Sequence, residues 1–440
     1  MKNSIEFRII IAALFIGLFY RVLRSVVFDS YIWILITPAI CLYYVYFSRG
    51  RYIKKNTLDK IFSYFIVNGF IMTLLGLFIS LNKLSIITLF VHIYAPASIY
   101  FVAKSYFSQN KESLKDYFNI ILVVAMILVI DILVENYLYL NHGLAERIPW
   151  IADGMQQSYA WGAIIWDSAK GMHDSPTRFL SILASGKSAG LLVAGLFCLI
   201  LPLSIEKSIF YNRGGFSRLL HHKYIKYLLL GGLIQVSFLL PSVANTVSLG
   251  LASAIIIMKS SRKIYGLYIL ILGLGLGYLA FWDSIQSLVH QRSNIINSYG
   301  QNAIDFIFQI KPLVEYYTST NILAYIFSAS VIPTYAPASS LTELDIFLLP
   351  IKYGIGWTII VLSGGYFLLK YSYRLIRFKN SNAKIIGLST LGYCIVILTN
   401  IHYPKFHIHG NYELMMVVAG ALSAFYDKHY SDQKNIRVLA

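Results

Sequence analysis

The chain has 440 residues, of which 57% are hydrophobic and only 13% are charged. Soluble domains carry about 25% charged residues, so this composition excludes an ordinary soluble protein and indicates one that crosses a membrane repeatedly. The formal net charge of +17 does not indicate a nucleic-acid-binding protein, because most charges lie in short segments between apolar stretches. The three cysteines all lie inside apolar stretches, so they provide neither a disulfide framework nor metal-type spacing.

A membrane-spanning helix needs about 20 mainly apolar residues, and about twelve stretches of this chain approach that length. In chain order they are residues 8–28, 30–47, 61–81, 84–103, 118–138, 187–205, 227–241, 243–259, 264–282, 355–375, 387–403 and 411–427. The first stretch follows Lys2 and Arg8 without a small-residue cleavage site, which predicts an uncleaved anchor. The sequence therefore predicts an all-α polytopic membrane protein that forms a single integral membrane domain over residues 1–440.

The basic residues between the spans predict the orientation of the chain. Lys and Arg concentrate on the cytoplasmic side of membrane proteins. Most of the 37 basic residues lie on one side if both termini are cytoplasmic, in segments such as "RGRYIKK", "KSYFSQNKESLK" (which begins at Lys104), "KSSRK" and "RLIRFKNSNAK". Two long segments, residues 139–186 and 283–354, then face outward.

Both long outer segments mix Trp, Tyr and Phe with Arg, His and Asp, so they are too aromatic to indicate disorder. Loops longer than about 15 residues between packed elements are usually functional or disordered. We therefore expect the functional residues in residues 139–186 and 283–354 and at the neighbouring membrane surface.

The stretch "SPTRFLSILASGKSAGLLVAG", residues 175–195, contains an arginine followed by small residues and a helix start. It resembles the Arg-leading segment of the O-antigen polymerase and O-antigen ligase superfamily. Arg178 is followed by Ser181, and Gly186-Lys187 stands where the family commonly has Pro-Asn. The number of spans, the order of the loops and the orientation also agree with that superfamily.

The stretch "SSLTELDIFLLPIKYGIGW", residues 339–357, resembles a second signature of the family: an acidic or His residue, an apolar run, and Gly-x-Gly entering a helix. The ligases carry a His at the first of these positions, whereas this chain has Glu343, which favours a polymerase. A competing match occurs at the last span, where His409 precedes Gly420 by the same distance as Glu343 precedes Gly354.

The chain also departs from the family pattern. In "PSVANTVS", where the family often has Ser-Arg, it has Asn245, so a possible phosphate-binding arginine is missing.

The resemblance implies transfer of a glycan from a polyprenyl diphosphate to a sugar hydroxyl, which requires cations for the diphosphate and a base for the hydroxyl. Arg178 is the first candidate cation, because guanidinium fits phosphate bidentately, and Lys187 stands beside it at a helix N-terminus. Arg292 and His290, at the start of the second outer segment, are the next candidates. An alternative for Arg178 is an interfacial arginine that contacts lipid headgroups.

Glu343 is the candidate base, and Asp345 could share this role. Ser340-x-x-Glu343 also has the form of a capping box, which would occupy the Glu343 carboxylate at a helix end. His407 and His409 are candidates for phosphate binding, with His409 also an alternative base; with His402 they would offer a zinc site, but their spacing matches no metal pattern. We expect neither a metal nor a cofactor.

These features predict an O-antigen or capsule repeat-unit polymerase in the bacterial inner membrane. Its substrate would be an undecaprenyl-diphosphate-linked oligosaccharide; the expected partners are membrane lipid and a chain-length regulator protein, with no nucleic acid. The alternatives are an O-antigen ligase, which transfers the glycan to lipid A-core, and a repeat-unit flippase. A transporter would place ionisable residues near the membrane midplane and keep short outer loops, and this sequence does the reverse.

Overall fold

The computed structural model describes residues 4–26, 56–79, 95–109, 113–142, 186–206, 222–240, 243–280, 354–378, 380–400 and 411–439, and the single residues Ala39, Trp282, Gln286 and Ile326. This part of the chain is helical and contains no strand, as predicted. Its helices are α1 (Ile5–Val26), α3 (Thr57–Ile79), α5 (Ala95–Gln109), α6 (Ser113–His142), α9 (Gly186–Ile205), α11 (Lys223–Leu239), α12 (Val243–Lys259), α13 (Lys263–Ala280), α19 (Ile355–Ile376), α20 (Ser381–Thr399) and α21 (Asn411–Leu439).

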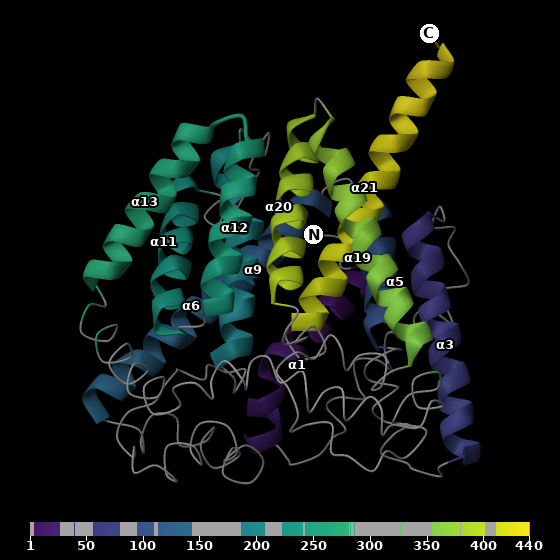
Figure 1. The fold of residues 1–440 in the computed structure, drawn as a ribbon, viewed down its shortest axis with the longest axis horizontal. Coiled ribbons are helices and arrows are strands. Elements are labelled where there is room, and N and C mark those ends of the chain that lie inside the picture. The colour runs from purple at the N-terminus through teal and green to yellow at the C-terminus, as the bar shows by residue number, and fades with distance from the viewer. Residues whose placement is uncertain are drawn as a thin grey trace, which may run out of the picture.

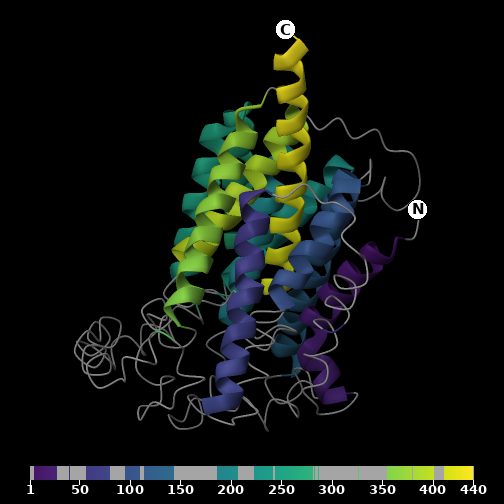
Figure 2. The same ribbon diagram turned by 90° about the vertical axis from the view of Figure 1, so that its right-hand side faces the viewer.

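The helices run up and down side by side and form a bundle with two ends (Figure 1). We call the end where α9, α12, α19 and α21 begin the lower end, and the opposite end the upper end. The helices α3, α6, α11, α13 and α20 begin at the upper end (Figure 1). Helix α21 continues beyond the others at the upper end (Figure 2).

Helix α20 joins two groups of helices. On one side of it, α21 packs on α5, α19 on α3, and α1 on α5. On the other side, α9 packs on α11 and α12, and α11 also contacts α6 and α13. Because α20 contacts α19 and α21 as well as α9 and α12, it lies between the two groups and links the C-terminal helices to the central ones.

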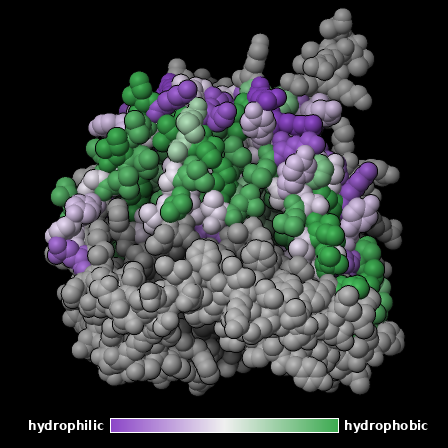
Figure 3. Space-filling view, viewed as in Figure 1, coloured by the Kyte–Doolittle hydropathy of each residue, from purple (hydrophilic) through white to green (hydrophobic). Residues whose placement is uncertain are grey.

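The outer faces of several helices carry apolar side chains. Ile264 is 87% exposed and Leu279 is 75% exposed, both on α13. On the face shown in Figure 3, hydrophobic side chains cover the middle of the helices and hydrophilic ones gather toward the upper end. Within the part of the chain that the structure describes, Ser113–Val134 of α6 and Ser381–Thr399 of α20 are long and apolar enough to cross a membrane.

Most described helices coincide closely with predicted spans, and α12 has the predicted bounds. The largest corrections fall at the ends of three spans, of which α5 continues to Gln109 rather than ending at residue 103. Helix α20 begins at Ser381 rather than residue 387, because the Asn380 side chain accepts the backbone N–H groups of Asn382 at 2.9 Å and Ala383 at 3.4 Å. Helix α21 continues to Leu439 rather than ending at residue 427. The span predicted at 30–47 and most of the one at 84–103 lie outside the described residues.

The upper end holds a buried ionic network that the sequence did not reveal. The sequence analysis assigned Lys104 to a cytoplasmic loop, but the residue lies inside α5 and its side chain is fully buried. Its ammonium group pairs with the carboxylate of Asp59 on α3, and lies 2.7 Å from the carboxylate of Asp427 on α21. One cation therefore joins three helices.

Neutral groups complete this network. The Tyr100 hydroxyl donates to Asp59 at 2.7 Å and lies 2.8 Å from the Ser423 hydroxyl. Asn56 and Asp59 exchange reciprocal side-chain-to-backbone hydrogen bonds at the start of α3. The Asn56 amide also donates to Ser423 at 2.7 Å and to Asp427 at 3.0 Å. We call these six residues the Lys104 network.

A second, smaller network links α9, α12 and α20 at the same end. The Glu206 carboxylate, directly after α9, accepts the Ser261 backbone N–H at 2.7 Å and lies 3.2 Å from the Lys384 ammonium. Burial alone would raise the pKa of the Glu206 carboxyl, but the Ser261 N–H and the Lys384 charge hold this pKa below its ordinary value. Glu206 is therefore held as a carboxylate that fixes the end of α9 against α20.

We expect Lys104→Met to destabilise the protein by about 3–5 kcal/mol, because it leaves the Asp59 and Asp427 carboxylates buried without their cation. The measurement is the midpoint of heat-induced unfolding of the purified protein in detergent. Lys60→Met is the matched control, since Lys60 is exposed on α3. Equal midpoints for the two variants would contradict the structural role of the Lys104 network.

Candidate functional site

The lower end is where the chain enters and leaves both long predicted outer segments. His142 ends α6 and Gly186 begins α9, while Ala280 ends α13 and Ile355 begins α19. In Figure 1, α6 and α13 run downward to these ends and α9 and α19 run upward from theirs, so all four helix ends are directed toward the lower end. Helix α6 runs a few residues past the predicted start of the first segment at residue 139.

Of the predicted site residues, only Lys187 lies in the described part of the chain, as the second residue of α9. The predicted helix start is thereby confirmed within one residue. The others lie outside the described residues: Arg178, His290, Arg292, Glu343, Asp345, His407 and His409. Ser340 and Glu343 of the predicted capping box likewise lie outside the described residues, and α19 begins at Ile355 with Gly354 as its N-cap.

A cluster of neutral polar side chains is buried near the lower end. The Ser248 hydroxyl on α12 lies 2.6 Å from the Thr399 hydroxyl and accepts the Asn400 amide N–H at 2.7 Å. Thr399 and Asn400 also bond to backbone carbonyls of α20, at 2.7 Å and 2.9 Å. These hydrogen bonds hold the end of α20 against the first turns of α12. We call Ser248, Thr399 and Asn400 the Ser248 cluster.

Asn245 has a packing role in the same region. Its amide fills the space that a side chain at Gly190 would occupy, and the Leu240 carbonyl oxygen lies 3.4 Å from the same point. Gly190 therefore allows α12 to approach the first turns of α9. The Asn245 side chain thus belongs to the packed contact between α9 and α12.

The Gly-x-Gly that was predicted to enter a helix does so. Gly354 has φ 83° and ψ 156°, a conformation that is essentially restricted to glycine. Its carbonyl oxygen accepts the backbone N–H of Thr358 at 3.2 Å and the Thr358 hydroxyl at 3.1 Å. A Cβ on Gly356 would lie 2.9 Å from the Asn68 side-chain oxygen, so the second glycine lets α3 approach α19. The motif turns the chain sharply from the second outer segment into α19.

Glu413, on the first turn of α21, is a buried carboxylate that the sequence analysis did not single out as a site residue. It is 1% exposed and lies against α1, where a Cβ on Gly17 would be 2.5 Å from its carboxyl carbon. Acidic residues inside an apolar bundle are costly and usually have a specific role. The sequence indicates His409 by its spacing from Gly420, whereas the burial of Glu413 depends on Gly17, which is distant in sequence.

The two ends of the bundle differ in charge. In the described helices, Arg21, Arg24 and Lys187 are the basic residues nearer the lower end. The other basic residues of these helices and of their immediate ends lie toward the upper end: Arg8, Lys60, Lys104, Lys115, Lys223, Lys226, Lys259, Arg262, Lys263, Lys370, Arg374, Arg377, Lys384, Lys428, Lys434 and Arg437. The lower end is thus poor in positive charge within the described part of the chain.

No group of three or more His, Cys, Asp or Glu side chains with metal-site geometry occurs among the residues that the structure describes. The predicted His402, His407 and His409 lie outside this part. Besides Arg21, Arg24 and Lys187, the described lower end offers backbone N–H groups, neutral amides and hydroxyls, and the buried Glu413 carboxylate.

No protein-family model matches the chain, and no curated protein matches it.

We expect Gly354→Ala to destabilise the protein by about 1–3 kcal/mol, the usual strain of a non-glycine residue in this backbone conformation. Gly356→Ala is the matched control, because the Asn68 side chain in its way can rotate. The measurement is the heat-unfolding midpoint in detergent, with Gly354→Ala expected clearly below Gly356→Ala. The reverse order would contradict the described turn into α19.

Proposed function

We propose that this protein is a repeat-unit polymerase of the O-antigen or capsule type, which crosses the bacterial inner membrane about twelve times with both termini in the cytoplasm. It would join lipid-linked oligosaccharides on the outer face of that membrane. The observation that carries the proposal is the arrangement at the lower end: the helix ends that flank both long segments lie at the end that is poor in basic residues.

The charge difference between the ends supports the orientation. Lys and Arg accumulate on the cytoplasmic side of membrane proteins, so the upper end would be cytoplasmic and the lower end would face outward. The segments that contain Arg178, Arg292 and Glu343 would then lie on the outer face. That is the side on which a polymerase of lipid-linked repeats acts.

The proposed reaction breaks the bond between the anomeric carbon of the donor glycan and the diphosphate oxygen. The acceptor hydroxyl forms the new glycosidic bond, its proton passes to Glu343, and the polyprenyl diphosphate leaves with the electron pair. Arg178 and Lys187, with Arg292 and His290, would stabilise the charge that develops on the diphosphate. The start of α9 supports this role, since the backbone N–H groups of a helix N-terminus favour an anion.

The buried Ser248 and Asn400 side chains are occupied in holding α12 against α20, so we expect the polar groups that bind the acceptor sugar in the long outer segments. Glutamate at residue 343, where the ligases have histidine, favours polymerisation over transfer to lipid A-core.

Deleting the gene should leave lipopolysaccharide with core that carries a single repeat, because repeat units would still be made, exported and ligated. The measurement is gel electrophoresis of lipopolysaccharide from the deletion strain and from the complemented strain. Uncapped core with full-length chains on polyprenyl diphosphate would indicate a ligase instead, and repeats trapped on the inner leaflet a flippase. An unchanged ladder would contradict all three functions.

Glu343→Gln should abolish or severely shorten the ladder, since losing a general base typically costs about 10²–10⁴-fold in rate. Glu315→Gln, the same substitution elsewhere in the second segment, is the control and should leave the ladder unchanged. Immunoblots should show equal amounts of both variants in the membrane. A normal ladder with Glu343→Gln would rule out Glu343 as the base.

A further inference from the structure

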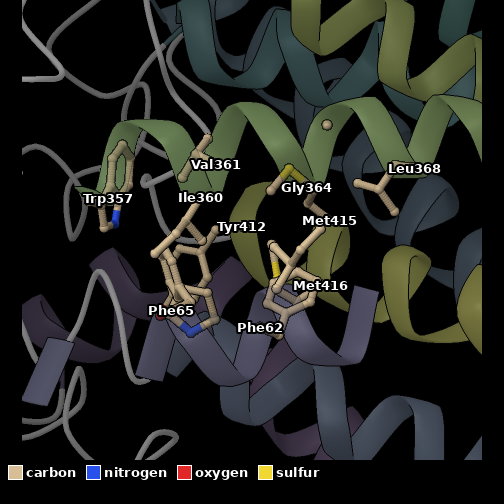
Figure 4. A pocket seen from close by; sticks show the side chains of 13 residues that line it. Phe62, Phe65, Trp357, Ile360, Val361, Gly364, Leu368, Tyr412, Met415 and Met416 are labelled. Carbon is tan, nitrogen blue, oxygen red and sulfur yellow. The ribbon is translucent and has the colours of Figure 1, made fainter. Parts of the chain in front are cut away.

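An apolar cavity of about 70 Å³ lies between α3, α19 and α21. Phe62 and Phe65 of α3 form one wall, and Met415 and Met416 of α21 form another (Figure 4). Helix α19 contributes the third wall, which runs from Trp357 to Leu368 and includes Gly364. The cavity therefore joins three segments that lie far apart in the sequence.

The shape of the cavity suits a narrow chain. Along α19 its wall extends for about 17 Å at about 1.5 Å per residue, roughly half the thickness of a bilayer core. An engineered apolar cavity of about 150 Å³ accommodates a benzene molecule. The cavity described here has about half that volume, so it holds a short stretch of hydrocarbon and not a ring. The remainder of such a chain would follow the exposed apolar side chains of the same helices, such as Ile359 and Leu362 of α19 and Val67 of α3.

Glycine and methionine make this cavity adaptable. The nearest side-chain atom to a Cβ built on Gly364 is the Ile61 methyl carbon at 3.8 Å, and nothing lies within 4 Å of one built on Gly365. The two glycines thus leave room on one side of α19 for a small lateral group. Met415 and Met416 face this room, and methionine adjusts readily to irregular apolar ligands.

The position of the cavity connects it to the lower end. Trp357 stands on the first turn of α19, directly after Gly354 and the segment that contains Glu343. Its ring lies 5.9 Å from that of Phe65, and both rings close the cavity at this end. A chain lying along α19 would therefore have its head group beside the residues that precede Gly354.

We propose that this cavity binds the prenyl chain of the lipid-linked substrate near its diphosphate end. The inference rests on the proposed function, which supplies a polyprenyl carrier. An aliphatic chain has no polar groups that the apolar walls would leave unpaired. A prenyl chain carries methyl branches at regular intervals, and the room beside Gly364 and Gly365 fits one branch, whereas a straight acyl chain has no group to fill it.

Gly364→Leu tests the proposal by filling the cavity with a side chain. The full-length protein in detergent is titrated with undecaprenyl phosphate, and the rise in its heat-unfolding midpoint gives an apparent affinity. Gly364→Leu should weaken this affinity by about tenfold, the loss expected from excluding about two methylene groups. Gly250→Leu, at a helical glycine with open space around it on α12, should bind as the unmodified protein does.

Phosphatidic acid with unbranched acyl chains is the matched ligand, because it presents the same phosphate on a different chain. It should bind the unmodified protein more weakly than undecaprenyl phosphate does. Equal binding of the two lipids would overturn the proposal in favour of a general lipid site. Val361→Phe fills the cavity from another position and replaces Gly364→Leu if that variant does not fold.

Unchanged undecaprenyl phosphate binding in a folded cavity-filling variant would also overturn the proposal. The result is separable from the proposed function, which is judged by the lipopolysaccharide of the deletion strain. If the deletion strain carries a single repeat but the cavity-filling variant binds undecaprenyl phosphate as the unmodified protein does, only the prenyl-binding role of the cavity is refuted. If the protein binds undecaprenyl phosphate selectively but the deletion strain has an unchanged ladder, the prenyl-binding role stands and the polymerase is refuted.

Discussion

The Lys104 ammonium lies between the carboxylates of Asp59 and Asp427, and this one cation positions three helices that are distant in sequence. Burying charged groups costs several kcal/mol for each ion unless partners surround them. Here a hydroxyl from Tyr100 and an amide from Asn56 satisfy further oxygen atoms of the carboxylates. The relative positions of α3, α5 and α21 at the upper end follow from this requirement.

The remainder of the bundle is arranged around close helix contacts. A Cβ on Gly420 of α21 would lie 2.7 Å from the Tyr100 carbonyl oxygen of α5, and one on Gly387 of α20 would lie 2.7 Å from the Ser372 carbonyl oxygen of α19. Small residues let helix backbones approach in this way in membrane proteins. Charge pairing and close backbone packing therefore coincide toward the upper end, whereas the described lower end depends on the Ser248 and Asn400 hydrogen bond, the buried Glu413 carboxylate and the helix start at Gly354.

The sequence predicted the helical class and most of the helix bounds, because apolar stretches with polar ends determine both. It failed where a charge belongs inside a helix: Lys104 and Lys384 were assigned to loops. Hydropathy weighs each residue alone, whereas the cost of burying Lys104 is offset by Asp59 and Asp427, whose proximity only the fold reveals. The helix starts at Lys187 and after Gly354 were predictable from local glycine chemistry.

The cavity and the cluster of Ser248, Thr399 and Asn400 could not be predicted from the sequence, because each forms only when helices distant in sequence pack together. Met415 and Phe62 are ordinary apolar residues in their own helices, and only packing places them around a common space. Ser248 and Asn400 likewise become partners because α12 and α20 meet. Conversely, the sequence singled out Arg178 and Glu343 by type and spacing, a kind of signal that packing cannot supply.

Helix α21 is one continuous helix that contributes residues to two separate sites. It runs without a break from Asn411 to Leu439, about 44 Å at about 1.5 Å per residue, and so exceeds the thickness of a bilayer core. Its first turns carry Met415 and Met416 of the cavity, and Asp427 farther along belongs to the Lys104 network. Because both sites lie on this continuous helix, a shift of α21 that widened the cavity would also move the Asp427 carboxylate relative to the Lys104 ammonium.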